Sequence, residues 1–247
     1  DGGPGQHLAD GLVVPAGAQL NFNNSSIPIN SLIIQSGGNV TVTSGVALDA
    51  HESIQVDAGA VLDVLPVSST NQNRIGKHGG DGSNFDGGPY SYEEAYGDFR
   101  NPRFPGASGY AWRYRYSWST SYRNYGSVAG GGVLRINTPQ LTVNGTIRAN
   151  GTTPTSGNTS CPYPNWCRQG AGAGGTVNIN VTTLDGSGTI EANGGDAPFT
   201  HQEAGAGGRI AIHYATYGSG AVHPADGLNT QAISGTAVDA ARGSGAG

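Results

Sequence analysis

The sequence predicts an all-β fold of the β-solenoid (β-helix-like) type, with Gly-rich turns and long inserted loops. Three observations lead to this prediction. Short apolar runs show alternating apolar and polar residues, Gly or Asn turns separate these runs, and the second half of the chain repeats itself. No stretch carries the 3.6-residue periodicity of a helix of ordinary length.

The first predicted strand stack covers residues 12–65. Apolar residues occur at every second position, as in Val40 and Val42 or Leu62 and Val64, so one side of each strand should face a core. The predicted strands include Leu32–Ile34, Val40–Val42, Val46–Leu48, Ser53–Val56 and Val61–Val64.

A Tyr-, Arg- and Gly-rich insertion follows at residues 66–130 and holds eight of the 11 tyrosines. Loops this long are uncommon unless they have a function or are disordered, so the insertion is the expected recognition surface. Tyr, Trp and Arg can stack on sugars or dock a partner, or they can fold over the strand stack and cover its apolar flank; both roles can hold together. The predicted binding residues are Tyr110, Trp112, Arg113, Tyr114, Tyr116 and Trp118.

A Gly-rich repeat stack is predicted at residues 131–217. Residues 131–151 and 174–194 are two copies of one unit that share the motif Thr-Ile-x-Ala-Asn-Gly, and a third copy opens at Gly207. Such a unit cannot bury its apolar face alone, but units stacked at the ~4.8 Å strand spacing build a continuous core. Glycines at the corners allow positive φ and close approach of successive coils, and Asn serves the same corners.

We expect a single domain spanning residues 1–247, with a low-complexity tail at 218–247. The chain begins at Asp1 without Met or a signal peptide and ends in a Gly/Ser/Ala run. It is therefore interpreted as a fragment of a larger chain.

Composition narrows the class of protein. Charged residues make up 12% of the chain, the formal net charge is -5, and there are only 12 Lys and Arg. This balance argues against a nucleic-acid partner or an anionic membrane surface. No apolar run approaches the ~20 residues of a spanning helix, so no membrane insertion is expected.

Two features point to a secreted product. Cys161 and Cys167 are close enough in sequence to close a small loop, and we expect a disulfide between them. The chain is also dense in Asn-x-Ser/Thr sequons, which accept N-linked glycans. The predicted glycosylation sites are Asn23, Asn24, Asn39, Asn144, Asn150, Asn158 and Asn180.

Catalysis is not expected, and neither a cofactor nor a metal is predicted. Enzymes built on β-solenoids need carboxylates clustered on one face of stacked strands, whereas the candidates here all lie in the insertion. The segment 81–87 has closely spaced oxygen donors, but it lacks the start and the closing Glu of a calcium loop. Six scattered histidines form no His-x-x-x-His pair. The candidate carboxylates are Asp81, Asp86, Glu93, Glu94 and Asp98, with Arg100 and Arg103 nearby in the sequence.

An ordered series of Gly-rich motifs carries a family resemblance. It runs from Gly76-Lys77-His78-Gly79-Gly80 to the most specific element, Gly207-Gly208-Arg209-Ile210-Ala211-Ile212. The series resembles a glycine-rich repeat region of large secreted or cell-surface proteins of plants, algae, oomycetes and bacteria, over about residues 30–217. A weaker similarity is to mastigoneme-type extracellular fibre proteins. The resemblance implies location and architecture and transfers no catalytic residue.

Together these observations predict a structural extracellular glycoprotein at the cell surface. It would be a building block of a fibre, sheath or surface layer, with further copies of itself and N-linked glycans as its partners. One alternative is a carbohydrate-binding or adhesive module that uses the insertion and binds polysaccharide. Another is a polysaccharide lyase or hydrolase.

Overall fold

The computed structural model describes the protein at residues 11–23, 27–68, 78, 97–109, 113–115, 122–124, 128–155, 170–198, 204–218 and 227–237. These residues form an all-β structure that contains no helix. Most strands belong to two sheets, and every pairing within both sheets is parallel. The arrangement is compatible with a β-helix-like fold.

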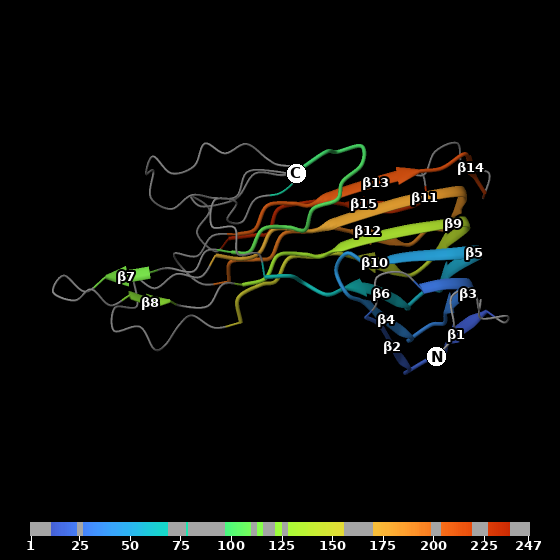
Figure 1. Ribbon diagram of the computed structural model, residues 1–247, viewed down its shortest axis with the longest axis horizontal. Helices are drawn as coiled ribbons and strands as arrows, with labels where there is room; N and C mark the ends of the chain where they lie inside the picture. The colour runs from blue at the N-terminus through green and yellow to red at the C-terminus, as the bar shows by residue number, and fades with distance from the viewer. Residues whose placement is uncertain are drawn as a thin grey trace.

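Sheet A and sheet B lie one behind the other, and both run through the molecule from its N-terminal to its C-terminal end (Figure 1). Sheet A has the order β1 (Leu12–Val14), β3 (Ile27–Ile34), β5 (Ala47–Val56), β9 (Val133–Val143), β11 (Thr176–Asp185) and β13 (Arg209–His213), with β14 (Thr216–Tyr217) also paired to β11. Sheet B has the order β2 (Gln19–Phe22), β4 (Asn39–Val42), β6 (Val61–Val64), β10 (Thr146–Arg148), β12 (Thr189–Glu191) and β15 (Asn229–Gln231).

The chain visits the two sheets in turn. β1 belongs to sheet A, β2 to sheet B and β3 to sheet A, and this alternation continues with two exceptions: β7 (Arg113–Arg115) and β8 (Tyr122–Asn124) form a separate pair, and β13 and β14 both belong to sheet A. The predicted strands of the first stack all appear, but the run 46–48, whose Val46 lies just before the strand, and the run 53–56 belong to one strand, β5. An irregularity between Asp49 and Ser53 shifts the register of β5 against β9, and this shift explains why the run looked interrupted in the sequence.

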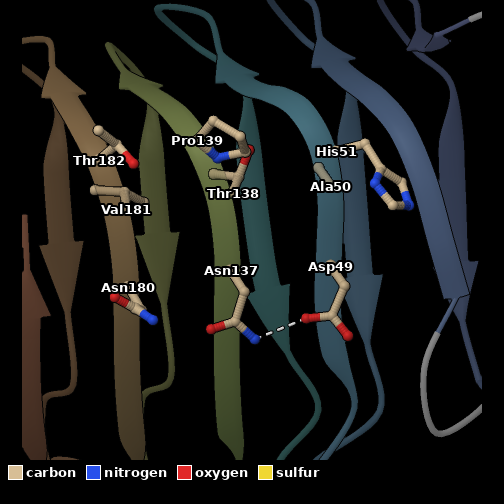
Figure 2. A pocket seen from close by; sticks show the side chains of 9 residues that line it. All are labelled: Asp49, Ala50, His51, Asn137, Thr138, Pro139, Asn180, Val181 and Thr182. Atoms are coloured by element: carbon tan, nitrogen blue, oxygen red, sulfur yellow. Dashed lines mark hydrogen bonds between the residues drawn. The ribbon is translucent and has the colours of Figure 1, made fainter.

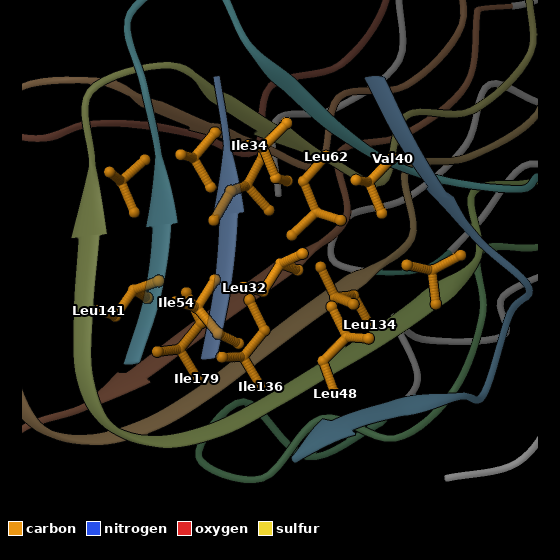
Figure 3. Packing of buried hydrophobic residues seen from close by; sticks show 14 of the residues in the cluster. Leu32, Ile34, Val40, Leu48, Ile54, Leu62, Leu134, Ile136, Leu141 and Ile179 are labelled. Atoms are coloured by element: carbon orange, nitrogen blue, oxygen red, sulfur yellow. The ribbon is translucent and has the colours of Figure 1, made fainter. Parts of the chain in front are cut away.

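Period-2 spacing does place one side of each strand in a core. The β4, β6 and β10 strands alternate between buried and half-buried residues. Buried residues of successive strands stack in columns, and one column of sheet B joins Val40, Leu62, Ile147 and Ile190. Figure 3 shows side chains from both sheets meeting in this interior. Each fully buried Leu or Ile contributes about 1.5–3 kcal/mol, so columns of this kind stabilise the sheets.

The two complete repeat copies pair directly with each other. Leu141 lies opposite Leu184, and Thr146 opposite Thr189, so residues 43 positions apart occupy equivalent places on adjacent strands. The repeat seen in the sequence is therefore one unit of the stack.

Beyond the strands, on one side of the sheets, extended Gly-rich segments prolong the stack (Figure 1). We call these segments the glycine bundle: residues 104–109, 128–132, 149–155, 170–175, 192–198, 204–208 and 232–237. Three successive backbone amides of one segment donate hydrogen bonds to three different neighbouring segments. The fourth amide donates to the first of these segments again. This is the pattern of a chain with three residues per turn, as in polyproline II. In the central segment Gly172 donates to Thr152, Ala173 to Ala107, Gly174 to Ala206 and Gly175 to Ala149, at 2.7–3.0 Å.

Glycine has two separate roles in this fold. Corner glycines such as Gly17, Gly37 and Gly59 have positive φ and end the short strands, as predicted. The bundle glycines instead lack φ values in the left-handed region but leave no room for a Cβ. A Cβ on Gly174 would overlap the carbonyl oxygen of Ala192. Close approach of backbones therefore explains glycine in the bundle, and corner geometry does not.

Candidate functional site

The structure describes only some of the predicted binding residues of the insertion. Arg113 and Tyr114 lie on β7 (Arg113–Arg115), which pairs antiparallel with β8 (Tyr122–Asn124), and only their backbone is described. Tyr110, Trp112, Tyr116 and Trp118 lie outside the described residues, as do Cys161 and Cys167 of the predicted disulfide. Both predictions stay predictions.

The described sequons differ in how they present their asparagine. Asn23, Asn144 and Asn180 are exposed, whereas Asn39 and Asn150 are half-buried. The Asn39 Oδ1 is buried and accepts no hydrogen bond within the described part of the chain. Asn24 and Asn158 lie outside that part.

A shallow hollow of about 380 Å³ lies on the outer face of sheet A, where β5, β9 and β11 bend (Figure 2). Its polar side chains come from three neighbouring strands. Asp49 of β5 accepts a 2.7 Å hydrogen bond from the Asn137 Nδ2 of β9, and Asn180 of β11 lies on the far side of Asn137. The lining residues are Asp49, Ala50, His51, Asn137, Thr138, Pro139, Asn180, Val181 and Thr182. One carboxylate with amides and hydroxyls suits recognition of a hydroxyl-rich group, while acid–base catalysis by paired carboxylates would need a second acid.

A second surface comes from residues 97–104 of the insertion, which we call the strap. The strap crosses the outer side of β11 and β13 and is fixed there by hydrogen bonds from their side chains. His213 Nε2 lies 2.8 Å from the Arg100 carbonyl oxygen, Asn178 Nδ2 donates to Asn101 Oδ1 (3.0 Å) and Pro102 O (3.4 Å), and Thr176 Oγ1 donates to Phe104 O (2.7 Å).

The strap presents aromatic and basic side chains to the outside. Phe99 is 67% exposed and Phe104 is 51% exposed, an unusual state for large apolar side chains. Arg100 and Arg103 are exposed beside them, and the Arg100 guanidinium lies 5.3 Å from the centroid of the Phe99 ring. The part of the insertion that the structure describes thus combines Phe with Arg, where the sequence had drawn attention to Tyr and Trp.

His78 is fully buried against the glycine bundle. Its Nδ1 lies 2.9 Å from the Gly174 carbonyl oxygen, and Arg209 Nη2 donates to its backbone oxygen at 3.5 Å. Burial, together with the positive charge of Arg209, lowers the pKa of His78 from 6.5 to about 4 against the opposing hydrogen bond to Gly174. His78 is therefore neutral at pH 7, and its ring attaches this part of the insertion to the bundle through Gly174.

Sequence reasoning assigned Asn to the corners, but it missed that the repeated Asn in Thr-Ile-x-Ala-Asn-Gly links successive units. Asn150 Oδ1 accepts from the Asn193 amide at 2.8 Å, and Asn193 Oδ1 accepts from the Ile233 amide at 3.1 Å. Each asparagine thus bonds to the next unit of the stack, at the junction between sheet B and the bundle. The motif's fixed position in both copies was the available signal.

The structure describes Asp98, Arg100 and Arg103 among the candidates for catalysis and metal binding. Asp98 Oδ1 accepts from the Arg100 amide at 2.8 Å, and Asp81, Asp86, Glu93 and Glu94 lie outside the described residues. In the described part of the chain, no group of three or more His, Cys, Asp or Glu could hold a metal ion. The same residues include no helix with the length and apolar character needed to cross a membrane.

No family model, curated protein or solved structure matches this chain. The resemblance to glycine-rich surface proteins therefore stays a prediction.

Proposed function

We propose that this chain is a β-solenoid that serves as the building block of an extracellular fibre, sheath or surface layer and carries N-linked glycans. The alternation of strands between sheets A and B supports the solenoid, because each pair of successive strands then completes one coil. The observation that carries the scaffold role is the state of the two ends. Within the described part of the chain, β1 and β2 end the sheets on one side, and β13 and β15 end them on the other.

Such ends favour head-to-tail assembly. An edge strand offers its outward N–H and C=O groups to another strand. Because all pairings are parallel, a second copy placed on β15 through its own β2 would continue the stack in the same direction. A head-to-tail contact does not close on itself unless its rotation does, and it therefore builds filaments.

The test removes one outward backbone donor. In β15 the Asn229 amide donates to Gly188 and the Gln231 carbonyl accepts from Ala192, so the Thr230 amide between them points to the free edge. Thr230→Pro removes that donor without removing a bond to β12. We expect electron microscopy to show filaments for the natural chain and for Thr230→Val, but monomers for Thr230→Pro. Natural protein that stays monomeric at all concentrations would rule out the scaffold.

The strap favours a second candidate, a carbohydrate-binding or adhesive module. Exposed Phe99 and Phe104 offer faces for sugar rings, and Arg100 and Arg103 offer paired donors for carboxylate or sulfate groups. Glycan-array binding that is lost in Phe99→Ala/Arg103→Ala, and kept when exposed Val13 is changed to Ala, would support this candidate. An array with no binding would remove it.

A further inference from the structure

The outer face of sheet A presents one sequon in a form suited to modification. Asn180 and Thr182 are both exposed on β11, while Val181 between them is 7% exposed and faces the core. Alternate residues of a strand point to the same face, so the asparagine and the hydroxyl that define the sequon lie side by side on the surface. The fold thus leaves the complete recognition element in the open.

The side chain of Asn180 also has no competing role. It makes no hydrogen bond to any other described residue, and it borders the hollow floored by Asp49 and Asn137 (Figure 2). On its other side lies His213, which holds the strap. The floor of the hollow offers carboxylate and amide groups to sugar hydroxyls.

Asn150 provides the opposite case in the same chain. It is half-buried, its Nδ2 donates to Glu191 Oε2 at 2.8 Å, and its Oδ1 accepts from the Asn193 amide. A sugar on this nitrogen would have to fit between units of the stack, beside the bonds that the amide makes to Glu191 and Asn193. Both residues belong to Asn-x-Thr sequons, but in the folded protein the Asn150 side chain is hydrogen-bonded whereas the Asn180 side chain is exposed.

We propose that Asn180 is an N-glycosylation site whose first sugar lies in the hollow against Asp49 and Asn137, and that Asn150 stays unmodified. In the attachment step a lipid diphosphate-linked oligosaccharide is the donor. The Asn180 Nδ2 forms a bond to the anomeric carbon, the bond from that carbon to the phosphate oxygen breaks, the lipid diphosphate leaves, and one amide proton is lost to a base. The inference rests on the proposed function, because it requires an exported protein.

Glycopeptide mass spectrometry of the protein purified from the organism that makes it tests the attachment. We expect a glycan on Asn180 in most copies and on Asn150 in fewer than about a tenth of them, since a sequon needs an accessible asparagine. Thr182→Ala, which destroys the sequon and leaves Asn180 in place, should abolish the modification. An unmodified Asn180, or an Asn150 that is modified as often, would overturn the proposal.

A second measurement tests whether the first sugar lies in the hollow. A glycan held in the hollow should be cleaved from the folded protein more slowly than a glycan on the exposed Asn144, which lies outside the hollow. Asn137→Ala should raise the rate of endoglycosidase cleavage at Asn180 about five-fold, the effect of one lost hydrogen bond, and leave the rate at Asn144 unchanged. Equal cleavage rates at Asn180 in the natural protein and in Asn137→Ala would show that the sugar does not lie in the hollow, provided that the thermal unfolding curves of the two proteins agree.

Filament assembly and glycosylation of Asn180 can be tested independently of each other. Filaments whose Asn180 is bare would overturn this site and leave the scaffold in place. Monomers with a glycosylated Asn180 would do the reverse.

Discussion

The two sheets and the glycine bundle stack the same chain by different physical means. In the sheets, columns of Val, Leu and Ile side chains fill the interior, and each strand bonds to its neighbours within one plane. In the bundle, backbones approach each other at glycines that leave no room for a Cβ, and one segment bonds to neighbours in three directions. A parallel stack can therefore continue past the end of its apolar core if glycine allows the backbones themselves to form the contact surface.

The largest effect should come from a side chain added inside the bundle. In Gly174→Ala the Cβ would overlap the Ala192 carbonyl oxygen and lie 2.6 Å from the Gly208 nitrogen, and neither backbone atom can move aside cheaply. We expect a loss of about 4 kcal/mol or more in urea unfolding. Gly17→Ala is the matched control: φ is 74° but no atom lies within 4 Å, so it should cost only about 1 kcal/mol. Similar losses for both variants would contradict close packing as the reason for the bundle glycines.

A cavity in the sheets should have the next largest effect. Ile147 is fully buried in the column between Leu62 and Ile190. Ile147→Ala should cost about 3 kcal/mol, measured by the same unfolding experiment. Amide exchange should then speed up in β10 and its neighbours. Unchanged stability would mean that the column is not tightly packed.

Acid should loosen the bundle through His78. The unfolded chain takes up a proton near pH 6.5, whereas the buried ring has a pKa of about 4, so protonation favours unfolding. The stability from neutral His78 is complete above pH 6.5 and is lost as the pH falls toward 4, by a total on the order of 3 kcal/mol. Urea unfolding at pH 7 and pH 4.5 measures this loss. His78→Gln should show a smaller difference between the two pH values, and an equal difference would exclude His78 as the cause.

The smallest effect concerns the junction between the two regions. Asn193→Ala removes the acceptor of the exposed Ile233 amide and should cost about 1 kcal/mol. Hydrogen exchange at the Ile233 amide should become faster, while Asn229→Ala, on exposed β15, should leave it unchanged. Equal exchange in all three proteins would show that the asparagine does not link the units.

Alternation of residue types was sufficient to predict most strands of sheets A and B. A buried face requires apolar residues at every second position, and this requirement is visible in four residues, as in β4 or β6. It was insufficient for β5, because the register shift after Asp49 interrupts the pattern without ending the strand. The hollow could not be predicted either, since Asp49 and Asn137 are 88 residues apart in sequence and meet only when β5 pairs with β9.

The sequence by itself determined the all-β character, the repeat unit and the positions where glycine must stand, because strand propensity and side-chain direction are local properties of a few residues. Only the tertiary structure decided which glycines turn corners and which pack in the bundle, that His78 is buried, and that Asn180 is exposed while Asn150 is engaged. Each of these depends on which segments lie beside one another, and such neighbours are separated by tens of residues along the chain.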